Sequence, residues 1–150
     1  MLITEAEKTD LSAILQLQYK AYQSEAELYN DYEIQPLRQS LKEIEEEFEQ
    51  CLILKAVRDD RIIGSVRATV LGETCKIGKL IVDPYAQNQG IGTALMKAVE
   101  KSCTNVKRLE LYTGYKSEKN LHLYEKLGFK AYKQEKVHER LSFVYLCKDV

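Results

Sequence analysis

The chain has 150 residues, of which 45% are hydrophobic and 30% are charged, and its net charge is −1. This length and composition predict a single domain, residues 1–150, with enough apolar residues to form a core. The balanced charge gives no reason to expect a nucleic-acid partner. No stretch is long and apolar enough to span a membrane, and the first residues lack a signal-peptide pattern. We therefore expect a cytoplasmic protein without membrane contact.

The cysteine and histidine pattern does not favour a metal site. The four cysteines are widely spaced and form no Cys-x-x-Cys pair, and neither histidine lies near one of them in sequence. Zinc sites need such clusters, so we predict no bound metal. Most of the cysteines lie in apolar runs and are interpreted as small core residues. The cysteines are Cys51, Cys75, Cys103 and Cys147, and the histidines are His122 and His138.

The first half of the chain predicts a strand, two helices and a hairpin. Residues 2–4 form a short strand, and helical spacing of apolar residues predicts a helix over 11–22. An acidic and tyrosine-rich connection over 24–38 follows. Ser40 and Glu43 form a capping box that begins the second helix. Residues 51–57 and 62–70 then form a hairpin around Asp59-Asp60.

The second half alternates strands and helices. We expect strands over 75–82, 108–112, 129–132 and 141–147, and helices over 90–102 and 117–127. The full order is β-α-α-β-β-β-α-β-α-β-β. A run of three strands followed by alternating elements predicts a mixed sheet with helices on both faces.

The most informative stretch joins the strand over 75–82 to the helix over 90–102. Asp83-Pro84 stops the strand, a polar loop follows, and Gly90-Ile91-Gly92 opens the helix. Glycines let the backbone approach a ligand closely, and the free N–H groups of a first helical turn attract anions. Strand, loop, glycines and helix in this order predict a phosphate cradle.

Several phosphate-binding patterns can be compared with this stretch. The P-loop pattern GxxxxGK[ST] is absent. A dinucleotide fingerprint is only partly met, because its third glycine would be Leu95 and seven residues separate Val82 from Gly90. An acidic residue does stand near the ribose-binding position, at Glu110, so a Rossmann interpretation stays open. The glycines of this stretch could also be ordinary turn residues.

Two motifs together resemble the GNAT N-acetyltransferase superfamily. Gln87-x-x-Gly90-x-Gly92 resembles the family's acetyl-CoA pyrophosphate loop, [RQ]-x-x-G-x-[GA]. About thirty residues later, Asn120 precedes Leu-Tyr-Glu-Lys-Leu-Gly-Phe, which resembles the family's C-terminal signature. The resemblance covers essentially the whole chain. It implies an α/β GNAT-like fold, a mixed sheet of about seven strands flanked by about four helices on both faces.

This resemblance implies an N-acetyltransferase with acetyl-CoA as the acyl donor. Tyr124 corresponds to the usual general acid. The departing coenzyme A thiol has a pKa of about 8.5, and a phenol with a pKa of about 10 can protonate its thiolate. Asn120 would bond the pantetheine amides, and one strand amide would stabilise the oxyanion. The other implied cofactor-binding residues are Leu80, Ile81, Val82, Gln87, Asn88, Gln89, Gly90, Ile91, Gly92 and Thr93.

The resemblance leaves the general base unassigned. Histone-type members use a glutamate at the position that is Lys76 here, and lysine cannot serve as the same base. Glu73, Glu110, Tyr112 and a water relay are the remaining candidates.

The acceptor is also open. The acidic residues of the connection over 24–39 suggest a small cationic amine drawn by charge, although acidic runs are commonly just solvated faces. The alternatives are a protein lysine or N-terminus as acceptor, and a sensor that binds acyl-CoA without turnover. By analogy with the family, the apolar strand over 141–147 could form a homodimer.

Overall fold

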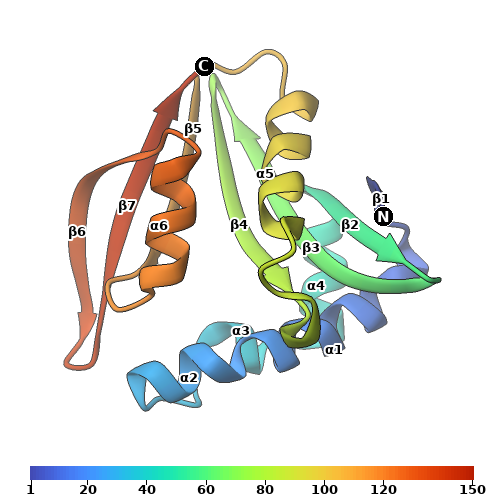
Figure 1. Cartoon of the computed structure of the whole chain (residues 1–150), viewed down its shortest axis with the longest axis horizontal. Coiled ribbons are helices and arrows are strands. Elements are labelled where there is room, and N and C mark those ends of the chain that lie inside the picture. Colours follow the sequence, from blue (N-terminus) through green and yellow to red (C-terminus); the bar gives the residue numbers. More distant parts are fainter.

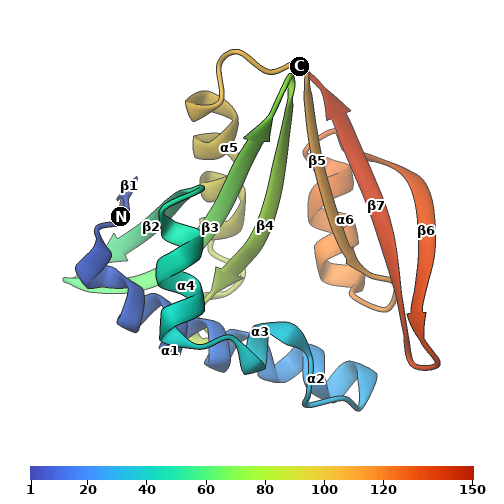
Figure 2. The same ribbon diagram turned by 180° about the vertical axis from the view of Figure 1, so that it is seen from behind.

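Seven strands form one mixed sheet in the computed structural model, which describes residues 1–150 (Figures 1 and 2). The strand order across the sheet is β1-β2-β3-β4-β5-β7-β6. Only β4 and β5 run parallel, and the other neighbours are antiparallel. The predicted fold class is confirmed. The strands are β1 (Leu2–Glu5), β2 (Leu52–Arg58), β3 (Arg61–Leu71), β4 (Thr74–Val82), β5 (Arg108–Gly114), β6 (Lys130–His138) and β7 (Leu141–Asp149).

Helices cover both faces of the sheet. In Figure 1 α5 and α6 lie in front of the strands, and Figure 2 shows α4 in front of the opposite face, with α1 to α3 crossing below. None of these helices has the length and apolar character needed to cross a membrane. The helices are α1 (Leu11–Ala21), α2 (Gln23–Tyr29), α3 (Gln35–Arg38), α4 (Leu41–Phe48), α5 (Ile91–Ser102) and α6 (Glu118–Lys126).

The alternation of side chains along the strands divides the core between the two faces. In β2, Ile53 packs in a small cluster with α1 and α4, whereas Leu54 belongs to the larger cluster under α5 and α6. This follows from the strand geometry, in which successive side chains point to opposite faces. Cys75 lies fully buried in the larger cluster, as predicted for a core cysteine.

The segment over 24–38 was predicted as a connection without helices, but it contains most of α2 and all of α3. The predicted number of helices was therefore too low. The α2 helix ends at Asn30, which has a φ of 49 in the left-handed region, and Pro36 stands in the first turn of α3. Short helices of this kind are stabilised by tertiary contacts, which a sequence pattern does not reveal. The predicted capping box at the start of α4 is confirmed, with Glu43 N donating to Ser40 Oγ over 3.1 Å.

The β6 strand is longer than predicted. It runs over Lys130–His138, and every one of its residues is exposed. An exposed edge strand lacks the alternation of apolar and polar residues by which a half-buried strand is recognised. A homodimer built on the last two strands stays a prediction, as does a cytoplasmic location.

Candidate active site

The sheet opens between β4 and β5. These parallel strands pair only from Thr74↔Arg108 to Lys76↔Glu110, and Figure 1 shows them diverging from there toward α1 and α2. We call the space between residues 77–82 of β4 and 111–114 of β5 the sheet opening. The edge of β4 that faces this opening has no strand partner. Its backbone groups are therefore free to bind a ligand.

A β-bulge lies on β4 beside the sheet opening. Two residues of β4, Lys79 and Leu80, stand opposite the single residue Val66 of β3. Lys79 has a φ of 50, the left-handed conformation that the first residue of one bulge type adopts. Bulges bend a strand and redirect its groups. The predicted pantetheine-binding segment, residues 80–82, begins at this bulge.

The predicted phosphate cradle lies at the end of β4. Its residues 87–90 are all exposed. Asn88 and Gly90 have φ values of 62 and 80, and the left-handed turn at Gly90 leads directly into α5. No side chain caps the start of α5. The N–H groups of its first turn are therefore free to receive an anion.

The start of α5 lies close to both sides of the sheet opening. A Cβ built on Gly92 would stand 3.4 Å from Leu123 Cδ2 of α6 and 3.9 Å from Leu80 Cδ2 of β4. The cradle therefore stands at the entrance of the opening. The side chain of Gln89, in the loop, is bound to β2, because its Oε1 accepts a hydrogen bond of 2.6 Å from Arg58.

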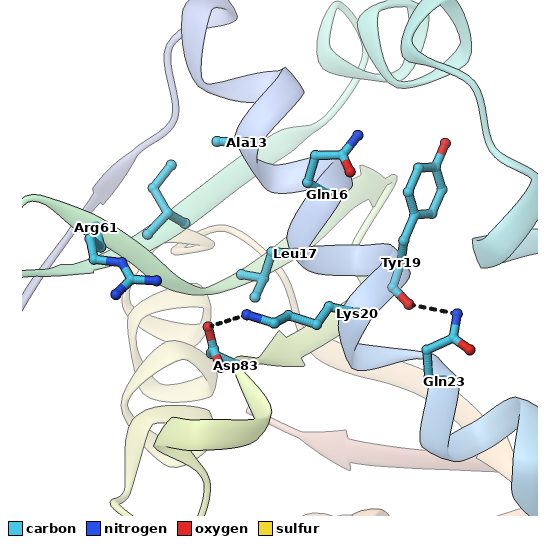
Figure 3. Close-up of a pocket in the computed structure, with 9 residues that line it drawn as sticks. Ala13, Gln16, Leu17, Tyr19, Lys20, Gln23, Arg61 and Asp83 are labelled. Carbon is cyan, nitrogen blue, oxygen red and sulfur yellow. Dashed lines mark hydrogen bonds and ion pairs between the residues drawn. The ribbon is translucent and has the colours of Figure 1, made fainter.

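An ion pair joins the cradle to α1 (Figure 3). Lys20 Nζ lies 3.4 Å from Asp83 Oδ2, and it also lies 5.5 Å from the centre of the Tyr85 ring. The pair stands at one side of a shallow groove of about 610 Å³ that also contacts Leu17 and Arg61. This groove contains none of the predicted cofactor-binding residues. Its ion pair holds Asp83, the residue directly after the end of β4.

Asn120 and Tyr124 lie one turn apart on α6. Asn120 Nδ2 donates to Thr113 Oγ1 over 3.3 Å and to Glu25 Oε1 over 3.5 Å. Tyr124 is buried, and burial followed by the negative charge of Glu25 raises the pKa of its phenol. The hydroxyl therefore stays protonated at physiological pH. A general acid must be protonated before it can donate its proton.

Two of the predicted base candidates lie at the closed end of the sheet opening. Glu110 stands in the last β4–β5 pair, and its Oε1 lies 2.9 Å from Arg108 Nε. Glu73 lies before β4 and its Oε1 is 3.5 Å from Lys107 Nζ. Both carboxylates are therefore already paired with cations.

The third candidate, Tyr112, lies on the sheet face that α6 does not cover. Its neighbours Leu109 and Leu111 point into the core under α5 and α6, so Tyr112 points to the other face. There its ring packs 4.5 Å from that of Phe143 and 5.4 Å from that of Tyr145, between centroids.

A buried arginine organises the same face. Arg67 of β3 is 3% exposed, and its guanidinium donates to Glu47 Oε2 over 2.9 Å and to the side-chain oxygens of Gln18 and Gln39. These contacts join α1, α4 and the segment between α3 and α4 to the sheet. Burial and Arg67 together lower the pKa of the nearby Lys79.

Cys51 and Cys75 do not resemble activated nucleophiles. Burial and the charge of Glu47 raise the pKa of Cys51 to about 11. Burial and the neighbouring Cys103 thiol, whose sulfur lies 3.3 Å away, raise the pKa of Cys75. A thiol with a raised pKa is a poor nucleophile at neutral pH. No group of three or more histidine, cysteine, aspartate or glutamate side chains is arranged to hold a metal ion.

Residues 11–129 match the model of the Acetyltransferase (GNAT) family, and the chain belongs to this family. Membership assigns it to the acyl-CoA N-acetyltransferases, the class of enzymes that acetylate amines with acetyl-CoA. In sequence it is 31% identical to YxbD of Bacillus subtilis (strain 168) over 74 residues, which are 48% of this chain and 45% of YxbD. It is 25% identical to YyaT of the same organism over 103 residues, 68% of each chain.

Solved structures share the fold. The ribosomal-protein-S18-alanine N-acetyltransferase of Escherichia coli superposes with a TM-score of 0.83 at 20% identity, over 99% of this chain and 93% of that one. The PaiA N-acetyltransferase of Thermoplasma acidophilum, solved in complex with coenzyme A, gives a TM-score of 0.81 at 18% identity over 100% of both chains. At such identities the likeness is one of fold.

Several residues of this region belong to no sequence motif. Tyr22 stands between α1 and α2, Glu47 lies on α4 and Arg67 on β3, and the fold alone brings them together. Burial, followed by the hydroxyl of Tyr124 and then the negative charge of Glu25, raises the pKa of Tyr22. The only sequence signal was the acidic run over 24–39, which does not indicate that Glu25 is the residue turned inward.

Proposed function

We propose that this protein transfers the acetyl group of acetyl-CoA directly to the amine of a small molecule. The observation that supports the proposal is the sheet opening, with the unpaired edge of β4 on one side, α6 attached to β5 through Asn120 and Thr113 on the other, and the uncapped start of α5 close to both. A thioester bound in this opening would have backbone N–H donors near its carbonyl oxygen and a phenol near its sulfur. This is the arrangement that acyl transfer needs.

The donor half of the mechanism uses two groups of backbone amides. Those of residues 87–93 bind the pyrophosphate, with the side chains of Gln87 and Thr93 beside them. Those of residues 80–82 bond the pantetheine and polarise the thioester carbonyl, aided by the amide of Asn120. A preorganised N–H donor stabilises the oxyanion because it needs no reorientation during the reaction.

The amine attacks the carbonyl carbon, and a tetrahedral intermediate forms. As it collapses, the C–S bond breaks and Tyr124 donates its proton to the departing sulfur. Burial keeps this phenol protonated beforehand. No covalent acetyl-enzyme is required, in keeping with the raised pKa values of the Cys51 and Cys75 thiols.

A protein lysine or N-terminus is the second candidate acceptor. The face of β5, β7 and β6 that α6 leaves uncovered in Figure 2 would let an extended chain approach the sheet opening. The E. coli structural neighbour acts, by its name, on a ribosomal-protein alanine. A panel of spermidine, glucosamine and alanine-ended peptides, compared at equal concentration, separates the two candidates.

The test of the cradle uses a matched pair of substitutions at Gly90. Gly90 has a φ of 80 and open space around its Cβ position, so Asn and Asp fit equally well there. We expect Gly90→Asp to weaken acetyl-CoA binding about tenfold more than Gly90→Asn at low salt, because only Asp adds a negative charge beside the pyrophosphate. Calorimetry at two salt concentrations measures this difference.

Acetyl-pantetheine, which lacks the pyrophosphate, is the control ligand. It should bind both variants alike. Equal acetyl-CoA affinities for the two variants would place the pyrophosphate elsewhere, and a wild-type protein that binds no acyl-CoA would overturn the proposed function. In that case the dinucleotide alternative would be tested with NAD.

A further inference from the structure

The α2 helix is fastened across the wide end of the sheet opening. Tyr29 of α2 accepts a hydrogen bond of 2.8 Å from Lys116 N and lies 2.9 Å from Ser117 Oγ, at the start of α6. Its hydroxyl also lies so close to Gly114 that a Cβ there would stand 2.0 Å from the oxygen. These contacts fix the position of α2 relative to β5 and α6.

Glu25 projects from this fixed helix toward α6. Its Oε2 accepts a hydrogen bond of 2.7 Å from Ser117 Oγ, and its Oε1 lies 3.5 Å from Asn120 Nδ2. The ionisable groups that respond to its charge are three tyrosines, Tyr22 and Tyr29 on its own side and Tyr124 on α6. All three phenols have raised pKa values and are neutral at physiological pH. The carboxylate thus lies within electrostatic range of the proposed acid.

Glu25 has no cationic partner. No lysine, arginine or histidine nitrogen lies within 4.0 Å of it among the ion pairs of the structure. Two other carboxylates of this region already have cationic partners. Glu47 is paired with Arg67 at 2.9 Å, and Asp31 lies 3.1 Å from His138 Nε2. A partly buried carboxylate without a cation is suited to receive one from a ligand.

We propose that Glu25 binds the ammonium group of the acceptor and takes its first proton. This inference rests on the proposed function and supplies the base that the sequence left unassigned. It also narrows the acidic-run hypothesis to one residue, because Asp31 is already paired and Glu33 is exposed.

The proton and electron balance is complete. One N–H proton passes from the ammonium to a Glu25 oxygen, and the freed lone pair forms the bond to the acetyl carbon. The C–S bond breaks with its electron pair on sulfur, which takes the Tyr124 proton. The second proton leaves the nitrogen as the intermediate collapses and restores the phenol, while Glu25 releases its proton to solvent. The sum is ammonium plus acetyl-CoA giving amide, coenzyme A and one proton.

The test compares three variants that separate charge from hydrogen bonding. Glu25→Gln removes the charge but keeps an oxygen that can accept from Ser117. Ser117→Ala removes that hydrogen bond but keeps the charge. Glu27→Gln removes the same charge from an exposed position on the same helix. Initial rates are measured from pH 6 to pH 10 with whichever of spermidine, glucosamine or Ala-Ala the wild type acetylates fastest.

We expect kcat/KM of Glu25→Gln to fall at least about 100-fold at pH 7, with acetyl-CoA affinity changed less than about twofold. The deficit should shrink steadily as the pH approaches the acceptor's own pKa, because free amine then no longer needs a base. Ser117→Ala should show a smaller loss that is the same at every pH, and Glu27→Gln should match the wild type.

Two outcomes would overturn the inference, and they are distinguishable. If the wild type turns over and Glu25→Gln matches Glu27→Gln in rate and pH profile, Glu25 is a structural contact between α2 and α6 and only this inference is wrong. If the wild type binds acetyl-CoA but acetylates no amine, or does not bind it at all, the proposed function is wrong and the inference with it.

Discussion

The donor half and the acceptor half of the proposed site, here called the donor side and the acceptor side, are built in different ways. The donor side uses two continuous segments, residues 80–93 and α6, and its chemistry rests mainly on backbone N–H groups. The acceptor side draws single side chains from α2, β3 and β5, which the fold gathers around Tyr22, and Glu47 of α4 joins them through its ion pair with Arg67. A donor common to a whole family can be held by backbone geometry. An acceptor that differs between members must be recognised by side chains.

The two sides also differ in charge. The donor side presents a helix start with no side-chain cap and a loop whose exposed residues carry no charge. The acceptor side contains Glu25, Glu47, Arg67 and Lys79, of which only Glu47 and Arg67 neutralise one another. The uncompensated groups, one anionic and one cationic, are those free to act on a substrate.

On the donor side, we expect the largest loss of activity from Tyr124→Phe. The phenyl ring fits the same buried site, so only the hydroxyl is lost. Without a proton donor for the sulfur, kcat should fall about 100-fold or more, while acetyl-CoA still binds and stabilises the protein. Initial-rate assays measure kcat, and a thermal-shift experiment measures the stabilisation by acetyl-CoA.

The same variant separates an enzyme from an acyl-CoA sensor. The raised pKa of Tyr124 also predicts no alkaline loss of wild-type activity from phenol ionisation up to pH 10. Undiminished turnover in Tyr124→Phe, or an alkaline limb below pH 10 that this variant abolishes, would contradict the assignment.

The contrast between the two sides explains which residues could be predicted from the sequence. The cradle and the α6 motif are local patterns, so their resemblance to family motifs was enough to nominate Gly90, Asn120 and Tyr124 as site residues. The paired strands followed from apolar runs. Glu25 and Arg67 are polar residues whose partners lie far along the chain, with Ser117 at a separation of 92 residues from Glu25. No short-range pattern encodes such a contact, and the same holds for the exposed strand β6.

A second prediction concerns the attachment of α2. In Gly114→Ala the new methyl group would collide with the Tyr29 hydroxyl and force the ring to move. The ring is almost fully buried, so it has no free space to move into. Overpacking of this kind should lower the free energy of unfolding by about 1–3 kcal/mol, and Tm by about 3–10 °C. Acetylation should fall as α2 and Glu25 shift, with acetyl-CoA binding retained.

Gly78→Ala is the matched control, since its Cβ position on β4 has nothing within 4 Å. Its Tm should lie within about 2 °C of the wild type. If Gly114→Ala were as stable as Gly78→Ala, or lost acetyl-CoA binding together with acetylation, the donor side and the acceptor side would not be the separate units described above.

The smallest expected effect concerns Lys79, the unpaired cation of the acceptor side. Burial, then the charge of Arg67, lowers its pKa from the ordinary value of 10.5. Between the lowered and the ordinary pKa, the unfolded chain binds more protons than the folded one, so stability rises with pH through that window. Below the window both states are protonated, and the folded state carries the full cost of the buried charge.

Lys79→Met removes that cost while keeping an unbranched side chain on the bulge. We expect its Tm at pH 7 to exceed that of the wild type by about 1–2 °C, and the difference to shrink as the pH rises toward 10.5. Lys79→Arg, which stays charged throughout, should show no gain at either pH. A gain for Met that is equal at pH 7 and pH 10.5 would mean that packing on the bulge, rather than the uncompensated charge of the acceptor side, sets the stability of this position.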